Sequence, residues 1–166
     1  MIGADVLLTT AELSLALGGF GSVVAAFMGN RKQWEPMEVV RFRALIVISL
    51  TAALVALIPF PLFHGGLKAS ALWTVASTVV VVILTFVLIG MLVYARAPMV
   101  THGSRLWSFT AIFIAILAVA INVLNAVGMG FASSFAGYFS GLLLMLILAG
   151  LYFIRLIVLS GPQVKG

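Results

Sequence analysis

The acidic residue Glu12 lies inside a long apolar stretch, and it is the first candidate for a chemical role in this sequence. Ionisable side chains are rare in membrane-spanning segments, where they usually face the interior of a helix bundle and mark a path for ions or protons. A carboxyl group in such a place can attract a cation or exchange a proton. We therefore take Glu12 as the leading candidate for a functional group.

Other polar side chains are predicted at a similar depth. Glu12 and Asn122 each lie about five residues inside the end of an apolar stretch, which is about 8 Å for a helix that rises 1.5 Å per residue. The same layer also holds Thr74, Ser77, Asn125 and Tyr138, with Thr78 and Ser140 at comparable depth. Two interpretations stay open: the layer binds or conducts a cation or proton, or it consists of polar contacts that hold the helices together.

Several kinds of catalytic and metal site are excluded. The chain has no cysteine, which rules out an iron–sulfur cluster, a thiolate zinc site and a catalytic thiol. His64 and His102 are predicted on opposite sides of the membrane and cannot share a metal ion. The acidic residues do not complete a carboxylate pair or a Ser/His/Asp set: they are Asp5, Glu12, Glu35 and Glu38. We expect no enzymatic activity, no cofactor and no metal site.

The elements that must position these side chains follow from composition. Of 166 residues, 64% are hydrophobic and 8% are charged, and the mean hydropathy is +1.30. A soluble domain needs about a quarter of its residues charged. Five apolar stretches are each long enough, at about 20 residues, to cross a hydrocarbon core of about 30 Å. Because only short connections remain, a soluble enzyme domain and a nucleic-acid-binding module are excluded.

The fold predicted from these stretches is all-α, a polytopic membrane helix bundle with five transmembrane helices in a single domain over residues 1–166. A segment in lipid must satisfy its own backbone hydrogen bonds, which favours helices for runs of this length. The five spans are predicted at about 7–28, 44–63, 71–94, 106–127 and 135–159. Near the end of the second span, Pro59 and Pro61 should break or kink the helix.

The placement of basic residues predicts the orientation, because Lys and Arg in short loops are retained on the cytoplasmic side. Eight basic residues fall on one side of the five-span arrangement: Arg31, Lys32, Arg41, Arg43, Arg96, Arg105, Arg155 and Lys165. Only Lys68 falls on the other side. The N-terminus is therefore predicted outside and the C-terminus inside. The formal charge of +5 is expected to have a topological role, with some attraction to anionic lipids.

Small residues at four-residue spacing predict close helix contacts. Gly18 and Ser22 provide such a pair in the first span, and Gly137 and Gly141 provide another in the fifth. These faces could pack within one chain or build a homo-oligomer, and both possibilities stay open. The fourth span carries a narrow stripe of small and polar residues that should face protein or a cavity: Ser104, Ser108, Ala111, Ala115, Ala118, Asn122 and Asn125.

A pattern near the N-terminus resembles that of a group of known proteins. Its motifs are Ala11-Glu12, Gly19-Phe20, a basic loop with Trp34 and Arg41, Ser49-Leu50 and Leu57-Ile58-Pro59. Over about the first 60 residues, this pattern resembles small uncharacterised bacterial inner-membrane proteins of similar length. The resemblance implies a bacterial inner membrane and brings no known activity or functional residues.

Two functions are consistent with these observations. The first is a homo-oligomeric channel or transporter-like protein that conducts or binds a cation or proton through the layer around Glu12, Asn122 and Asn125. The alternative is a non-catalytic accessory or assembly subunit of a larger membrane complex. Both place the chain in the lipid bilayer, and neither involves nucleic acid.

Overall fold

A computed structural model describes residues 3–29, 36–95, 102–130 and 133–159, and the regular secondary structure in these ranges is helical. The helices are α1 (Ala4–Gly29), α2 (Pro36–Leu57), α3 (Pro59–His64), α4 (Ala69–Ala95), α5 (His102–Ala126) and α6 (Phe135–Leu159). Within these ranges, five helical spans are long and apolar enough to cross a membrane. The chain is thus an all-helical bundle with the composition of a multi-pass membrane protein.

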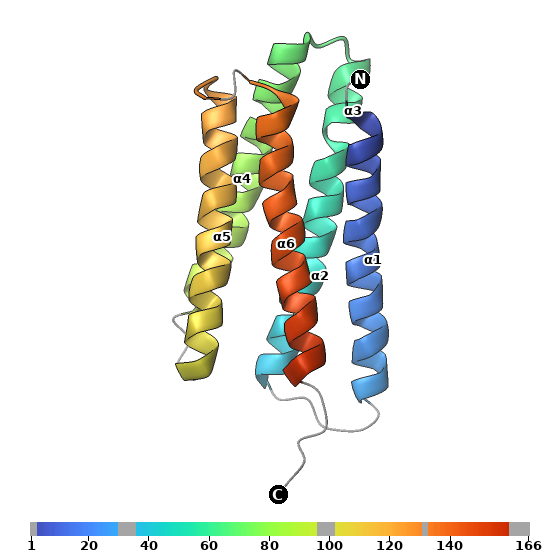
Figure 1. Cartoon of the computed structure of the whole chain (residues 1–166), viewed down its shortest axis with the longest axis vertical. Coiled ribbons are helices and arrows are strands. Elements are labelled where there is room, and N and C mark those ends of the chain that lie inside the picture. Colours follow the sequence, from blue (N-terminus) through green and yellow to red (C-terminus); the bar gives the residue numbers. More distant parts are fainter. Residues whose placement is uncertain (1–2, 30–35, 96–101, 131–132, 160–166) are drawn as a thin grey trace, which may run out of the picture.

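The long helices run alternately up and down the bundle (Figure 1). We call the end at which α1 begins the upper end and the opposite end the lower end. Helix α1 packs mainly on α2 and, less extensively, on α6. Helix α5 packs between α4 and α6, and α6 also packs on α2. Helix α1 therefore lies at one edge of the bundle, with one side covered by its neighbours.

The second predicted span is two helices. Helix α2 begins at Pro36, about two turns before the predicted start of the apolar span, because proline is well suited to the first turn of a helix. It ends at Leu57, and the short helix α3 continues from Pro59. As the sequence indicates, the prolines interrupt the helix near its upper end, because a proline has no N–H for the helical hydrogen bond.

The carbonyl group of Val55 shows how this interruption is accommodated. In a continuous helix its oxygen would accept a hydrogen bond from the N–H of residue 59, which proline lacks. Here the Val55 oxygen accepts a bond from the N–H of Ile58, at 3.1 Å, and another from the buried hydroxyl of Tyr138 on α6. Tyr138 thus joins α6 to the point at which α2 ends.

The contact between α1 and α2 depends on small side chains. The buried side of α1 carries Leu7, Ala11, Ser14, Gly18, Gly21 and Ala25, at alternating steps of four and three residues. A Cβ atom on Gly18 would lie 3.3 Å from the Cβ atom of Ser49, and one on Gly21 would lie 2.5 Å from Leu45 Cδ2. The two backbones therefore approach closely, as small residues allow in lipid.

Candidate functional site

The buried carboxamide of Asn125 is the centre of the polar layer. Its Nδ2 donates to Ser77 Oγ at 2.8 Å and to the carbonyl oxygen of Ser134 at 3.1 Å, and its Oδ1 accepts from the N–H of Ser134 at 2.9 Å. Ser133 Oγ accepts from the Thr74 hydroxyl and donates to the Asn125 backbone oxygen, both at 3.0 Å. This network fastens the connection between α5 and α6 to α4.

Asn122 lies about one turn below Asn125 on α5 and is also fully buried. Its Nδ2 donates to the carbonyl oxygen of Ala118 on its own helix, at 2.9 Å, and its Oδ1 is buried without a hydrogen-bond partner. The two glycines of α6 lie against these carboxamides, Gly137 beside Asn125 and Gly141 beside Asn122. Any added Cβ atom would collide with them.

The outer members of the predicted layer are not part of this network. Thr78 is exposed and Ser140 is half-buried, and their hydroxyls donate to carbonyl oxygens of their own helices, each at 2.8 Å. Thr74, Ser77 and Asn125 are joined by hydrogen bonds through the network, whereas Tyr138 bonds to Val55. The predicted stripe on α5 is buried from Ala111 to Asn125.

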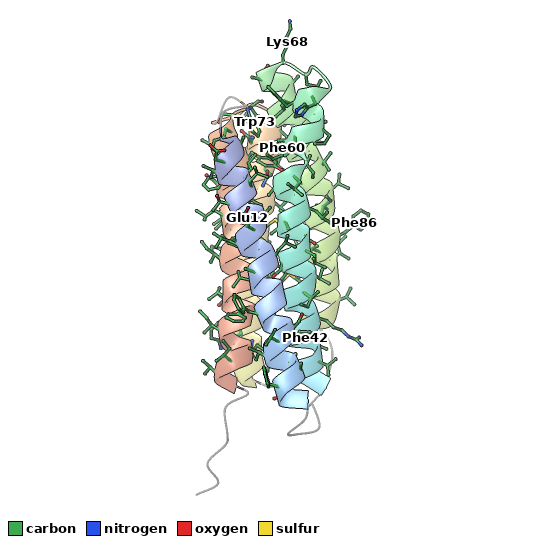
Figure 2. All side chains as sticks on the ribbon, turned by 90° about the vertical axis from the view of Figure 1, so that its right-hand side faces the viewer. Glu12, Phe42, Phe60, Lys68, Trp73 and Phe86 are labelled. Carbon is green, nitrogen blue, oxygen red and sulfur yellow. The ribbon has the colours of Figure 1, made fainter. Side chains whose placement is uncertain are left out.

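Glu12 is not among these groups. Its side chain is exposed on α1, the helix that packs on α2 and α6 rather than on α4 and α5 (Figure 2). Depth along a helix axis does not fix rotation about that axis, and the carboxyl group faces outward. The structure therefore separates the one carboxyl of the predicted layer from the two carboxamides.

Glu12 belongs to a line of residues on the exposed side of α1. At steps of four and three residues the line carries Asp5, Thr9, Glu12, Ala16, Gly19, Val23 and Ala26, all exposed. A Cβ atom on Gly19 would meet no atom within 4 Å. At 3.6 residues per turn, the larger side chains of Leu8 and Leu15 flank the line on one side, and those of Leu13 and Phe20 flank it on the other. We call this line the α1 outer seam.

The exposed sides of α4 and α6 carry mainly large apolar side chains. On α4 the exposed large side chains include Val75, Val79, Val82, Phe86, Ile89 and Val93. On α6 they include Leu143, Ile147, Ile154 and Val158. Large aliphatic and aromatic groups of this kind suit contact with lipid chains. Small residues are instead enriched where one transmembrane helix meets another, so the α1 outer seam has the composition of a helix contact.

The predicted packing residues of α1 divide between its two sides. Gly18 is buried against α2. Ser22 is exposed, and its hydroxyl donates to the carbonyl oxygen of Gly18 at 3.0 Å. Gly137 and Gly141 pack on α5, within the same chain.

The sequence analysis missed a second group of polar residues, at the lower end. A cavity there is lined by Arg41 and Arg43 of α2, Tyr152 and Arg155 of α6, and apolar side chains. The sequence predicted a topological role for these arginines, with some attraction to anionic lipids, but it did not bring them together in one site. Arg155 could have been noticed, because it lies four residues before the end of the fifth predicted span rather than in a loop.

In the described parts of the chain, no three His, Asp or Glu side chains are placed to bind a metal ion. Comparison with protein-family models, with curated proteins and with solved structures gave no match to this chain.

Proposed function

We propose that this chain is a non-catalytic accessory subunit of a larger complex in a bacterial inner membrane, oriented with its N-terminus outside. In this proposal, the α1 outer seam binds a transmembrane helix of a partner protein. The main support for this proposal is the position of the Glu12 carboxyl on the exposed side of an apolar span.

A charged side chain that faces lipid costs about 2.5–3.5 kcal/mol at the centre of a membrane helix, on scales derived from membrane insertion, and less nearer its ends. Glu12 lies between the centre and the upper end of its span. A partner helix that supplies a hydrogen-bond donor would offset this cost. The seam is suited to such a helix, since Ala16, Gly19 and Ala26 would allow close approach of the two backbones. Its spacing of three and four residues keeps two helices in register along a left-handed crossing.

Charge complementarity favours a different protein over a second copy of this chain. Two copies inserted in the same orientation and joined along their α1 outer seams would bring Glu12 against Glu12, and Asp5 against Asp5. The seam has no Lys, Arg, Asn or Gln to donate to those carboxyls. A partner helix with a basic or amide side chain at the depth of Glu12 would pair with it.

The proposal is tested by the size of the complex that contains this chain in native membranes, extracted as polymer-bounded nanodiscs. In wild type, the protein content of the particle, apart from its lipid and polymer, should have a mass greater than the 17.6 kDa of this chain and include a second protein. Gly19→Leu should release the chain, because its side chain would fill the seam. The matched control is Gly150→Leu, since a Cβ atom on Gly150 of α6 also meets nothing within 4 Å. Equal release by both variants, or no assembly in wild type, would refute the proposal.

A cation or proton pathway between copies of this chain is a second candidate function. It is favoured by the exposure of Asp5, Thr9 and Glu12 along the upper half of the seam. Ion flux into liposomes should then be lost in Glu12→Gln and retained in Asn122→Ala, because Asn122 is buried within the chain. Equal flux for wild type and Glu12→Gln would exclude this function.

A further inference from the structure

The cavity at the lower end of the bundle has a volume of about 490 Å³. This is within the range of sites that enclose small-molecule ligands. Helices α2 and α4 line two of its walls, and they pack against each other far less than against their other neighbours. The exposed lining residues are Arg43 and Val47 of α2 with Phe86 and Gly90 of α4. The cavity therefore opens sideways, between α2 and α4, onto the surface that faces lipid.

Positive charge is concentrated at this cavity. Arg41, Arg43 and Arg155 line it, and the lining residues that the structure describes include no Asp or Glu. Among the described residues of the lower end, the acidic residue is Glu38, one turn before Arg41, and it already has an interaction. Arg41 and Arg155 line the same cavity, so their like charges repel each other. Such an arrangement is electrostatically unfavourable unless an anion lies between the two groups.

Arg155 has an unsatisfied donor. The residue is 9% exposed, and its Nε is buried without a hydrogen-bond partner. Its guanidinium carbon lies 5.3 Å from the centre of the Trp107 ring, so one face of the group is covered by an aromatic ring. A buried N–H without an acceptor costs free energy, and an arginine offers a planar fork that matches a phosphate or carboxylate.

Membrane topology alone does not account for this burial. Retention of positive charge on one side of the membrane requires only that basic residues remain at that side, which the exposed Arg43 satisfies. Arg155 is instead held inside the bundle, beside Arg41 and at the wall of a cavity.

The apolar residues that line the cavity indicate which class of anion would fit it. Ile48, Val87 and Ile112 form apolar walls, and Val47 and Phe86 stand at the opening. The Phe86 side chain projects outward from α4 (Figure 2). These apolar walls suit an acyl chain, which a free inorganic anion lacks, and a lipid could enter from the side with its acyl chain against them. Basic pockets between transmembrane helices are a known way to hold lipid headgroups.

We propose that this cavity binds one anionic phospholipid, with its phosphate on Arg155 and Arg41 and the start of an acyl chain along the apolar walls. Arg43 lies at the opening and attracts the headgroup. This binding is independent of the partner helix proposed for α1, because the cavity is lined by α2, α4, α5 and α6.

The test is native mass spectrometry of the full chain, released from detergent and titrated with lipid. Phosphatidylglycerol should bind at one molecule per chain, at least about tenfold more tightly than phosphatidylcholine with the same acyl chains, because charge-assisted hydrogen bonds dominate. Arg155→Gln should remove this preference. Lys68→Gln should not, because Lys68 lies at the opposite end (Figure 2).

A second pair of variants tests the cavity without changing its charge. Gly90→Leu places a side chain at the opening, where a Cβ atom meets nothing within 4 Å, and should weaken binding of phosphatidylglycerol about tenfold or more. Gly150→Leu is the matched control and should bind like wild type. If Arg155→Gln does not fold, Arg43→Gln and Gly90→Leu provide the test, since both residues are exposed.

Three results would overturn the proposal. They are equal binding of the two lipids, an equal effect of the arginine and Lys68 variants, and unchanged binding in Gly90→Leu. Inorganic phosphate or laurate that displaces phosphatidylglycerol at equal concentration would show an anion or fatty-acid site instead, and would also overturn it.

Discussion

Asn125 and Glu12 are both polar and both lie in the upper half of the bundle, but one side chain is buried and the other is exposed. The carboxamide of Asn125 is buried, with both of its polar atoms in hydrogen bonds to neighbouring residues. The carboxyl of Glu12 is exposed at the edge of the molecule. The first side chain stabilises the fold of one chain, and the second is available to another molecule.

Replacement of Asn125 by alanine should destabilise the chain by about 1–3 kcal/mol, because it removes the donor to the buried Ser77 hydroxyl and the acceptor for the N–H of the half-buried Ser134. The measurement is unfolding in mixed detergent micelles. Thr78→Ala is the control, since the Thr78 hydroxyl is exposed and bonds only to its own helix. A loss of stability as small as that of the control would show that the Asn125 network does not stabilise the bundle.

Tyr138→Phe should cost about 1 kcal/mol, because it removes the hydroxyl that donates to Val55. The cost should fall in a Pro59→Ala background, where residue 59 regains an N–H for the same carbonyl oxygen. A double-mutant cycle measures this coupling. Additive effects of the two substitutions would contradict the role assigned to the Tyr138 hydroxyl.

The positions of the helices along the chain could largely be predicted from the sequence. The side of each helix that faces its neighbours could not. Span lengths follow from hydropathy and from the thickness of a bilayer, and the predicted span at 135–159 matches α6. The early start of α2 was also predictable, because Pro36 suits the first turn of a helix, although the charged residues Glu38, Arg41 and Arg43 lie outside the apolar run.

The polar layer was predicted by depth alone, which identified Asn125 and Ser77 as neighbours but not the outward direction of Glu12. That direction depends on which side of α1 meets α2, and both sides of α1 carry small residues at the same spacing. The lower cavity needs Arg41 and Arg155 to be brought together from α2 and α6, a pairing that no local sequence pattern indicates.

Contact between α5 and α6 should be intolerant of larger side chains. Gly141→Leu should lower the stability by about 1–3 kcal/mol or prevent folding, because its side chain would collide with Asn122. Gly150→Leu on the same helix should change the melting temperature little, since its Cβ atom meets nothing within 4 Å. Equal tolerance of the two substitutions would place the Gly141 side of α6 in lipid.

At the scale of the whole molecule, α1 and α4 both begin at the upper end (Figure 1). Gly3 and Lys68 directly precede these helices. Three arginines of α2 and α6 lie towards the lower end: Arg41, Arg43 and Arg155. The distribution of Lys and Arg predicts that the lower end is cytoplasmic. A cysteine at Gly3 should therefore react with an impermeant thiol reagent in intact cells, and one at Gln33, which lies outside the described residues, should not. The chain has no other cysteine to interfere. Reversed labelling would invert the orientation.

The α1 outer seam is the feature of the whole molecule that distinguishes a bundle complete in itself from one that belongs to a larger assembly. The most direct measurement is photo-crosslinking in native cells, with a photoreactive residue at Ala16 on the seam or at Ile147 on the lipid-facing side of α6. The account predicts one protein adduct of defined mass from position 16, its loss in Glu12→Leu, and no protein adduct from position 147. An adduct of twice 17.6 kDa would show that a second copy of the chain binds the α1 outer seam. The absence of any adduct specific to position 16 would show that no protein binds there. Either result would contradict the proposed function.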